Sequence, residues 1–107
     1  MYINIFHYVL REDCDVAAYD ALAVEMYAIV AGDPQYEFVG LERFATSDRE
    51  GVVLESFGSL EGATRWAHCP EHRAAMKRGR AEFYEKYVGH GTVEDHNYSF
   101  ERKTVQP

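Results

Sequence analysis

The sequence contains few cysteines, and this scarcity argues against a small domain held together by disulfides. Cys14 and Cys69 are the only two thiols among 107 residues, whereas secreted domains that depend on disulfides carry several cysteine pairs. We therefore expect a reduced chain located in the cytoplasm. Residues 1–6 lack the basic region and the small-residue cleavage site of a signal peptide, which agrees with this expectation.

Long hydrophobic runs and an excess of positive charge are also absent. No stretch approaches the roughly 20 apolar residues of a membrane span. Lysine and arginine number 11 against 18 aspartates and glutamates, which gives a net charge of −7. An acidic chain is poorly suited to bind nucleic acid or anionic lipid, so neither is expected as a partner. The basic residues from Arg73 to Lys86 are interpreted as the solvated face of a helix.

Several motifs that carry chemistry are missing as well. The chain has no Gly-x-Gly-x-x-Gly fingerprint, no phosphate-binding P-loop and no nucleophile elbow. His68, Cys69 and His72 lack the spacing of a zinc finger or zinc ribbon, and Pro70 interrupts the helix between the two histidines. The sequence therefore predicts no metal and no cofactor.

What the sequence does contain is apolar material for a single domain over residues 1–107, with 103–107 expected to fray. Hydrophobic residues make up 47% and aromatic residues 14% of the chain, which is typical of a globular core. Hydrophobic periodicity and turn residues predict seven elements. They are a strand at 2–10, a helix at 15–31, a strand at 36–45 with a bulge near Gly40, a strand at 51–57, helices at 60–67 and 70–87, and a strand at 92–100.

This order of elements predicts an α+β fold of the ferredoxin-like, split βαβ type. Its four-stranded antiparallel sheet would run last, first, third, second, with the helices on one face. The opposite face is expected to carry the apolar residues Tyr2, Phe6, Tyr8, Val52 and Leu54. An apolar sheet face that no helix covers predicts a homodimer through that face.

The most specific sequence pattern lies in residues 51–87. It comprises the strand Gly-Val-Val-Leu-Glu-Ser-Phe at 51–57, the segment Trp-Ala-His-Cys-Pro-Glu-His-Arg at 66–73, Gly79-Arg80, and Phe83-Tyr84-x-x-Tyr87. This pattern resembles the antibiotic biosynthesis monooxygenase superfamily. The resemblance implies a dimeric α/β barrel, in which two four-stranded sheets close against each other. Its members include cofactor-free oxygenases of phenolic polyketides or quinols, haem-degrading enzymes and uncharacterised proteins.

Three positions disfavour the haem-degrading branch. Its members carry an Asn on the first strand, a Trp at the end of the third and a His ligand on the long helix. By alignment, the matching positions here are His7, Phe57 and Met76. Without an imidazole at the last of these, haem iron lacks its usual axial donor. His72, one turn earlier, is the alternative donor.

The same alignment suggests a catalytic pair. It turns His7, with Ile3 and Ile5, toward the cavity between sheet and helices, and it turns Glu55 and Phe57 there from the neighbouring strand. A cofactor-free oxygenase needs a base in an apolar pocket, because the deprotonated substrate itself supplies electrons to dioxygen. His7 is the predicted base, or else a satisfied core histidine. Glu55 is its predicted orienting partner, or else an ion-pair partner of a helix arginine.

The predicted substrate-binding residues surround this pair. Phe57 and Trp66 would form aromatic walls, or else Trp66 anchors the short helix in the core. His72 and Arg73 would bind an oxyanion or carboxylate at the mouth, or else serve as contacts at the start of the helix. Tyr84 would place its hydroxyl in the pocket, or else be a core aromatic.

The sequence thus predicts a cofactor-independent monooxygenase acting on a small aromatic, polyphenolic or quinol-type compound. The alternative is a dimeric protein of the same fold that binds a small hydrophobic ligand without catalysis. A third hypothesis is haem binding or haem degradation. Fold alone does not separate these functions.

Overall fold

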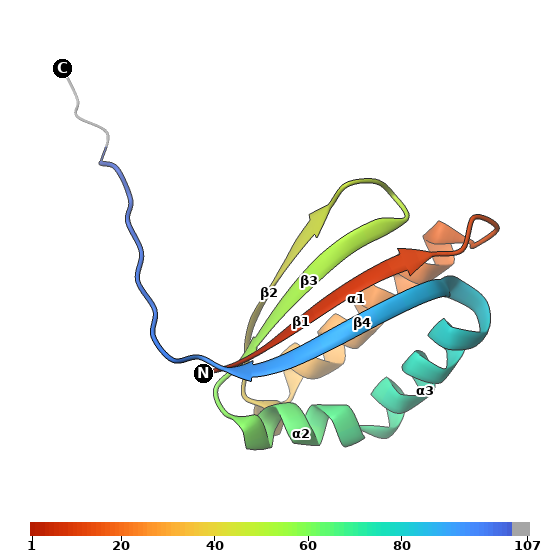
Figure 1. Ribbon diagram of the computed structural model, residues 1–107. Coiled ribbons are helices and arrows are strands. Elements are labelled where there is room, and N and C mark those ends of the chain that lie inside the picture. The colour runs from red at the N-terminus through yellow and green to blue at the C-terminus, as the bar shows by residue number, and fades with distance from the viewer. Residues whose placement is uncertain (104–107) are drawn as a thin grey trace.

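The computed structural model describes residues 1–103, so the prediction of a frayed end at 104–107 lies outside the described residues. Its elements follow the predicted order (Figure 1). They are β1 (Tyr2–Leu10), α1 (Val16–Gly32), a 3₁₀ turn (Pro34–Tyr36), β2 (Phe38–Ala45), β3 (Glu50–Phe57), α2 (Leu60–His68), α3 (Pro70–Arg78), a π-helical segment (Gly79–Phe83) and β4 (Tyr84–Val93).

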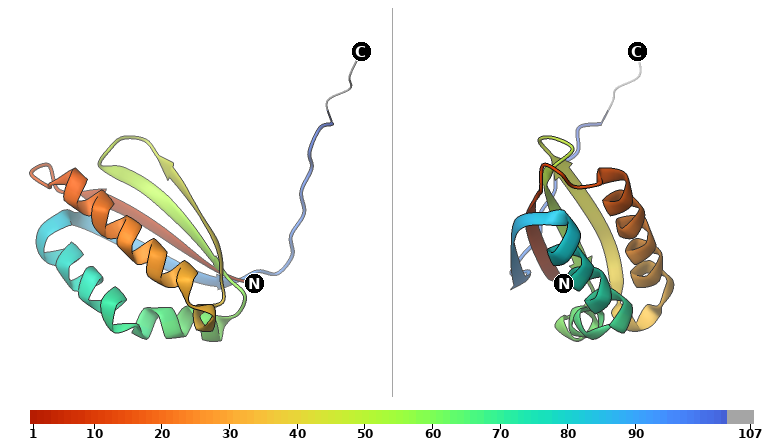
Figure 2. Two further views of the ribbon diagram at one scale, coloured as in Figure 1. Left: turned by 180° about the vertical axis from the view of Figure 1, so that it is seen from behind. Right: turned by 90° about the vertical axis from the view of Figure 1, so that its right-hand side faces the viewer.

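The sheet has the predicted strand order. Its four strands run β2-β3-β1-β4, and all neighbouring pairs are antiparallel. The helices cover one face of this sheet and leave the other face bare (Figures 1 and 2). The predicted ferredoxin-like α+β fold is therefore confirmed. Within residues 1–103, none of the helices is both long enough and apolar enough to cross a membrane.

Local sequence signals explain where the helices begin. The Asp15 side chain accepts a hydrogen bond from the Ala18 amide at 3.0 Å and caps α1. Ser59 caps α2 in the same way through the Gly62 amide at 3.1 Å. Pro70 occupies the first turn of α3, where its missing N–H removes no helical hydrogen bond. The resulting break between α2 and α3 turns the chain beneath the sheet.

The predictions for the ends of two elements were wrong. The second strand begins at Phe38, because Pro34–Tyr36 form the 3₁₀ turn. The last helix was expected to reach Tyr87, but the α-helix ends at Arg78, the π-helical segment ends at Phe83, and the strand begins at Tyr84. The predicted strand at 92–100 therefore lies eight residues too late at its start.

Pairing with β1 explains the early start of β4. Tyr87 lies opposite Tyr8 in the register and its ring is 5.1 Å from that of Phe6. Aromatic residues favour strands, and here Tyr84 and Tyr87 cover the sheet instead of continuing the helix. Pairing in the sheet also satisfies the backbone groups of a glycine-containing segment that shows little apolar alternation.

The face assignment of β1 was also wrong. Tyr2, Asn4 and Phe6 lie opposite Phe57, Glu55 and Val53 of β3, and these residues all line the cavity beneath the helices. Side chains alternate along a strand, so Ile3, Ile5 and His7 lie on the bare face. The assignments on β3 were right: Glu55 and Phe57 face the helices, together with Val53, and Val52 and Leu54 face outward. The predicted bulge in β2 is confirmed by a register shift between Phe38 and Gly40.

The covered face of the sheet packs into two buried clusters. One comprises Tyr8, Leu10, Cys14, Tyr19 and Phe83. The other comprises Val30, Tyr36, Phe57, Trp66 and Cys69. Members of both clusters contribute to the wall of one cavity, so the packing that stabilises the fold also shapes the candidate site.

Candidate functional site

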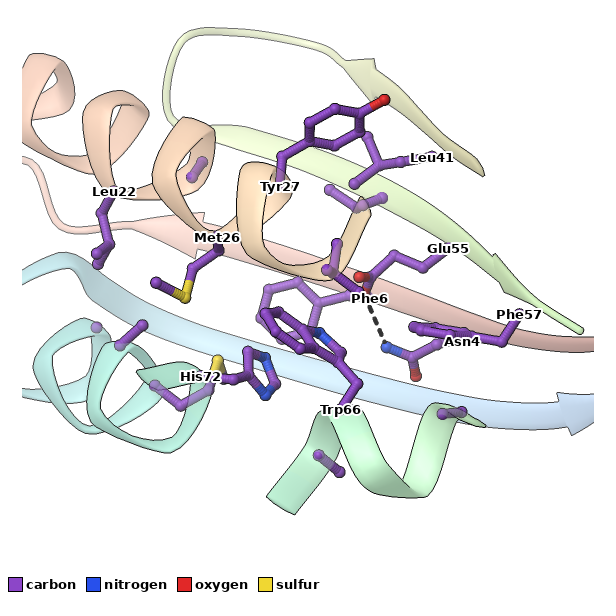
Figure 3. A pocket seen from close by; sticks show the side chains of 18 of the residues that line it. Asn4, Phe6, Leu22, Met26, Tyr27, Leu41, Glu55, Phe57, Trp66 and His72 are labelled. Carbon is purple, nitrogen blue, oxygen red and sulfur yellow. Dashed lines mark hydrogen bonds between the residues drawn. The ribbon is translucent and has the colours of Figure 1, made fainter. Parts of the chain in front are cut away.

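A cavity of about 340 Å³ lies between the sheet and the three helices. Its wall is mostly aliphatic and aromatic, with side chains from β1, β3, α1, α2 and α3 (Figure 3). Apart from tyrosines, the ionisable groups among its lining residues are Glu55 and His72. Concave apolar sites with a few convergent polar groups are the usual form of small-molecule sites.

Glu55 brings a carboxyl group into this apolar wall. Asn4 lies directly opposite on β1, and its Nδ2 donates a hydrogen bond to Glu55 Oε1 at 3.2 Å (Figure 3). Burial raises the pKa of Glu55 above its ordinary value of 4.5, and the hydrogen bond from Asn4 opposes that rise. The carboxyl is thus held in one orientation and has an increased affinity for a proton, which are the properties of a general base.

His72 and Trp66 form a stacked pair on the opposite wall. Their ring centroids are 4.4 Å apart and their planes differ by 26°. The interruption between α2 and α3 at Cys69–Pro70 produces this contact, because it places the first turn of α3 beside the indole at the end of α2. Burial lowers the pKa of His72 below 6.5, and the Trp66 backbone offsets this only in part. His72 is therefore neutral at pH 7.

His72 also has an unused polar atom. Its Nδ1 is buried and finds no hydrogen-bond partner within residues 1–103. Leaving a buried polar atom without a partner costs about 1–3 kcal/mol. Such an atom beside a cavity is suited to bind a polar group of a ligand.

Two tyrosines supply hydroxyl groups to the cavity wall. The Tyr19 and Tyr84 oxygens are 3.3 Å apart and share a hydrogen bond. Burial raises the pKa of both phenols, so both stay protonated at neutral pH. Gly79 makes room for Tyr84, since a Cβ at that glycine would lie 2.5 Å from Tyr84 Cε2. The glycine at the start of the π-helical segment thus leaves the space that the Tyr84 ring occupies.

The structure brings together five of the seven residues that the sequence singled out. Glu55, Phe57, Trp66, His72 and Tyr84 all line the cavity. What each of them does for a substrate stays a prediction.

The remaining two lie elsewhere. Arg73 is exposed and lines a second hollow beside α3. The prediction that His7 faces the cavity was wrong: it lies on the bare face, where its Nε2 is 3.0 Å from Glu50 Oε2 and its side chain is 46% exposed. Both faces of β1 are rich in apolar residues, so hydrophobic alternation did not indicate which face is covered.

Asn4 is a site residue that sequence reasoning missed. It carries an amide side chain, whereas the other residues on the covered face of β1 are aromatic or aliphatic: Tyr2, Phe6, Tyr8 and Leu10. A polar side chain among buried aromatic residues is a signal that it has a polar partner. Among residues 1–103 no group of three or more His, Cys, Asp or Glu side chains is placed to hold a metal ion.

Comparison of the sequence with known proteins identifies a distant relative. No family model matches the chain. The relative is YqjZ of Bacillus subtilis strain 168, described as uncharacterized. It is 29% identical over 86 residues, which cover 80% of this chain and 74% of YqjZ.

Solved structures show that the fold is shared with known proteins, although the sequence identity is low. Rv0793 of Mycobacterium tuberculosis has a TM-score of 0.75 at 14% identity, over 92% of this chain and 98% of that one. SnoaB of Streptomyces nogalater, described as a cofactor-independent oxygenase, has a TM-score of 0.73 at 12% identity, over 90% and 94%. A protein described as an antibiotic biosynthesis monooxygenase has a TM-score of 0.72 at 8% identity, over 88% and 98%.

These similarities extend over almost the whole chain and over nearly complete neighbours, and at such low identity they concern the fold. The resemblance indicated by residues 51–87 is thus confirmed at that level. This chain has the ferredoxin-like fold of the antibiotic biosynthesis monooxygenase-type proteins.

Proposed function

We propose that this protein is a cofactor-independent monooxygenase that acts on a small aromatic, polyphenolic or quinol-type compound. The observation that carries the proposal is the apolar cavity in which Asn4 holds the carboxyl of Glu55. The structural similarity to SnoaB, described as a cofactor-independent oxygenase, supports the same class of reaction. Phe57 and Trp66 offer flat apolar surfaces for an aromatic ring.

Glu55 replaces His7 as the base in this proposal. For an anthrone-type substrate, the carboxylate removes a proton from the ring CH₂ group and leaves a carbanion. The carbanion transfers an electron to dioxygen, and the resulting radical pair combines to a peroxide anion. This anion takes the proton back from Glu55 and becomes a hydroperoxide.

A second deprotonation completes the reaction. Glu55 removes the remaining proton from the same carbon, the O–O bond breaks, and a carbonyl group forms as hydroxide leaves. The hydroxide takes the proton from Glu55 and becomes water. One oxygen atom enters the substrate and the other enters water, and the substrate provides all the electrons. The apolar wall assists by keeping bulk water from the carbanion.

Oxygen uptake tests this proposal. Metal-stripped protein is given anthrones, naphthols and quinols, beside the variants Glu55→Gln and His7→Ala. We expect uptake above the autoxidation blank, a fall of about 10²- to 10⁴-fold in Glu55→Gln, and little change in His7→Ala. Equal uptake by the wild type and Glu55→Gln would exclude Glu55 as the base. Absence of uptake together with quenching of Trp66 by the same compounds would favour the ligand-binding alternative.

The proposal includes a homodimer formed through the bare sheet face. Val52 and Leu54 lie on this face with Ile3 and Ile5, and no helix of the described chain covers them. Apolar faces of this kind are usually buried by association. We expect Val52→Lys to shift sedimentation from dimer to monomer. The matched control is Val24→Lys, because Val24 is 70% exposed on α1, on the helical side.

Haem binding is a second candidate because of His72. The alignment assigned the ligand position to Met76, but the structure places the neutral imidazole of His72 at the cavity wall with its Nδ1 unpaired among the described residues. Neutral imidazole is the usual nitrogen donor to haem iron. Titration with haemin tests this: a Soret shift that His72→Ala abolishes supports haem binding, and an unshifted spectrum argues against it.

A further inference from the structure

A second hollow, beside α3, borders the cavity and is lined by three basic side chains. Arg73, Lys77 and Arg80 line it, and no acidic residue is among its lining residues. Ala67, His72 and Met76 belong to the walls of both the hollow and the cavity. A molecule held in the cavity therefore lies one side chain away from a group of cations.

The three cations have few internal partners. Their spacing of four and three residues places them along one side of the helix. Within residues 1–103, Arg73 and Lys77 make no salt bridge, and Arg80 Nη1 donates only to the Tyr87 hydroxyl, at 3.3 Å.

The acidic residues of the same helical segments face other groups. Glu82 pairs with Arg78 at 2.8 Å, outside the hollow. Glu71 accepts a hydrogen bond from the Cys69 thiol at 3.1 Å. The hollow thus keeps an uncompensated positive charge in a chain whose net charge is −7.

Because the hollow and the cavity share a wall, we propose that the substrate carries an anionic group, with a carboxylate as the simplest form. The aromatic ring lies in the cavity against Trp66, and the anion lies in the hollow near Arg73, Lys77 and Arg80. The unpaired Nδ1 of His72 is available between them for a hydrogen bond. This inference rests on the proposed function, since it names the class of compound that the same cavity takes.

The charge of the hollow gives the substrate its orientation. Cations that flank a mostly apolar pocket attract an anionic ligand and fix which end enters first. Hydrogen bonds between charged partners are also about twice as strong as neutral ones. The acid group would stay at the mouth, and the opposite end of the ring system would reach Glu55.

Paired probes test this inference. 3-Hydroxy-2-naphthoate and its methyl ester share the same ring and hydroxyl group and differ in charge. Trp66 is the only tryptophan of the chain and lines the cavity, so its fluorescence reports binding there. We expect the acid to bind about tenfold tighter than the ester at low salt, with most of the preference lost at high salt.

Substitutions then locate the charge. Arg73→Gln and Lys77→Gln should each reduce the preference for the acid severalfold and leave binding of the ester unchanged. Arg102→Gln removes the same charge from a residue outside both walls and should leave the preference intact. Equal binding of acid and ester, or a preference that survives both Arg73→Gln and Lys77→Gln, would overturn the inference.

Oxygen uptake separates this inference from the proposed function. Turnover of neutral anthrones, combined with equal binding of acid and ester, would preserve the oxygenase and overturn the anionic substrate. A preference for the acid that depends on Arg73 and Lys77, without uptake from any compound, would support the anion site and contradict the oxygenase.

Discussion

Asn4 and Glu55 form a hydrogen-bonded pair across β1 and β3 at 3.2 Å, inside an apolar cavity. The same two strands carry a second polar pair on their other face, where His7 and Glu50 approach to 3.0 Å. Only the first pair is shielded by helices. A glutamate is therefore part of a candidate catalytic group on the covered face and of an exposed polar pair on the bare face.

The pH dependence of activity should reveal how Asn4 acts on Glu55. The hydrogen bond from Asn4 lowers the pKa of Glu55, so Asn4→Ala should raise this pKa further. Because a general base acts when deprotonated, the rising limb of the pH–rate profile should move to higher pH in Asn4→Ala. Activity well above this limb should fall much less than in Glu55→Gln. An unshifted limb would show that Asn4 does not tune the base.

Replacing Glu55 with glutamine should stabilise the folded protein at pH 7, although it lowers activity. Burial raises the pKa of Glu55 in the folded state, so its contribution to stability is present below about pH 4.5 and is lost as pH rises through the folded-state pKa. Glu55→Gln should therefore melt at a higher temperature than the wild type at pH 7, with the difference shrinking toward pH 4. Thermal denaturation at several pH values checks this. A lower melting temperature at pH 7 would contradict it.

Trp66 fluorescence should report the protonation of His72. The pKa of His72 is lowered by burial, so the folded state loses stability as pH falls from 6.5 through that lower value. A protonated imidazole stacked on an indole quenches its emission, and the two rings are 4.4 Å apart. We expect emission to fall below pH 6.5 and to stay constant over the same range in His72→Gln. The same titration of both proteins in denaturant provides the reference.

A side chain at position 79 should destabilise the folded protein. A Cβ there would lie 2.5 Å from Tyr84 Cε2, so Gly79→Ala must displace the Tyr84 ring and should cost about 1–3 kcal/mol of unfolding free energy. The matched control is Gly32→Ala at the end of α1, where nothing lies within 4 Å of a built Cβ. That substitution should be neutral or stabilise by up to about 1 kcal/mol. Urea denaturation compares the two, and equal effects would contradict the close packing.

Much of the fold was predictable because its signals are local. Asp15 and Ser59 cap helices, Pro70 begins one, and the register shift in β2 falls at the glycine that the apolar pattern indicated. Once the order of strands and helices is known, few sheet topologies remain. The alignment also placed Glu55 and Phe57 on the covered face of β3, so two of the five predicted residues that line the cavity lie on a single strand.

The sequence by itself thus determined the element order, the sheet order and the covered face of β3. Only the tertiary structure decided which face of β1 is covered and where the last helix ends. Ile3, Ile5 and Val9 are as apolar as Tyr2, Phe6 and Tyr8, so hydrophobic alternation does not indicate which face of β1 the helices cover. Tyr84 and Tyr87 suit a helix or a strand, and their contacts with β1 selected the strand. A shift of one residue exchanges the two faces of a strand. The covered face of β1 therefore carries Asn4, whereas His7 was expected there.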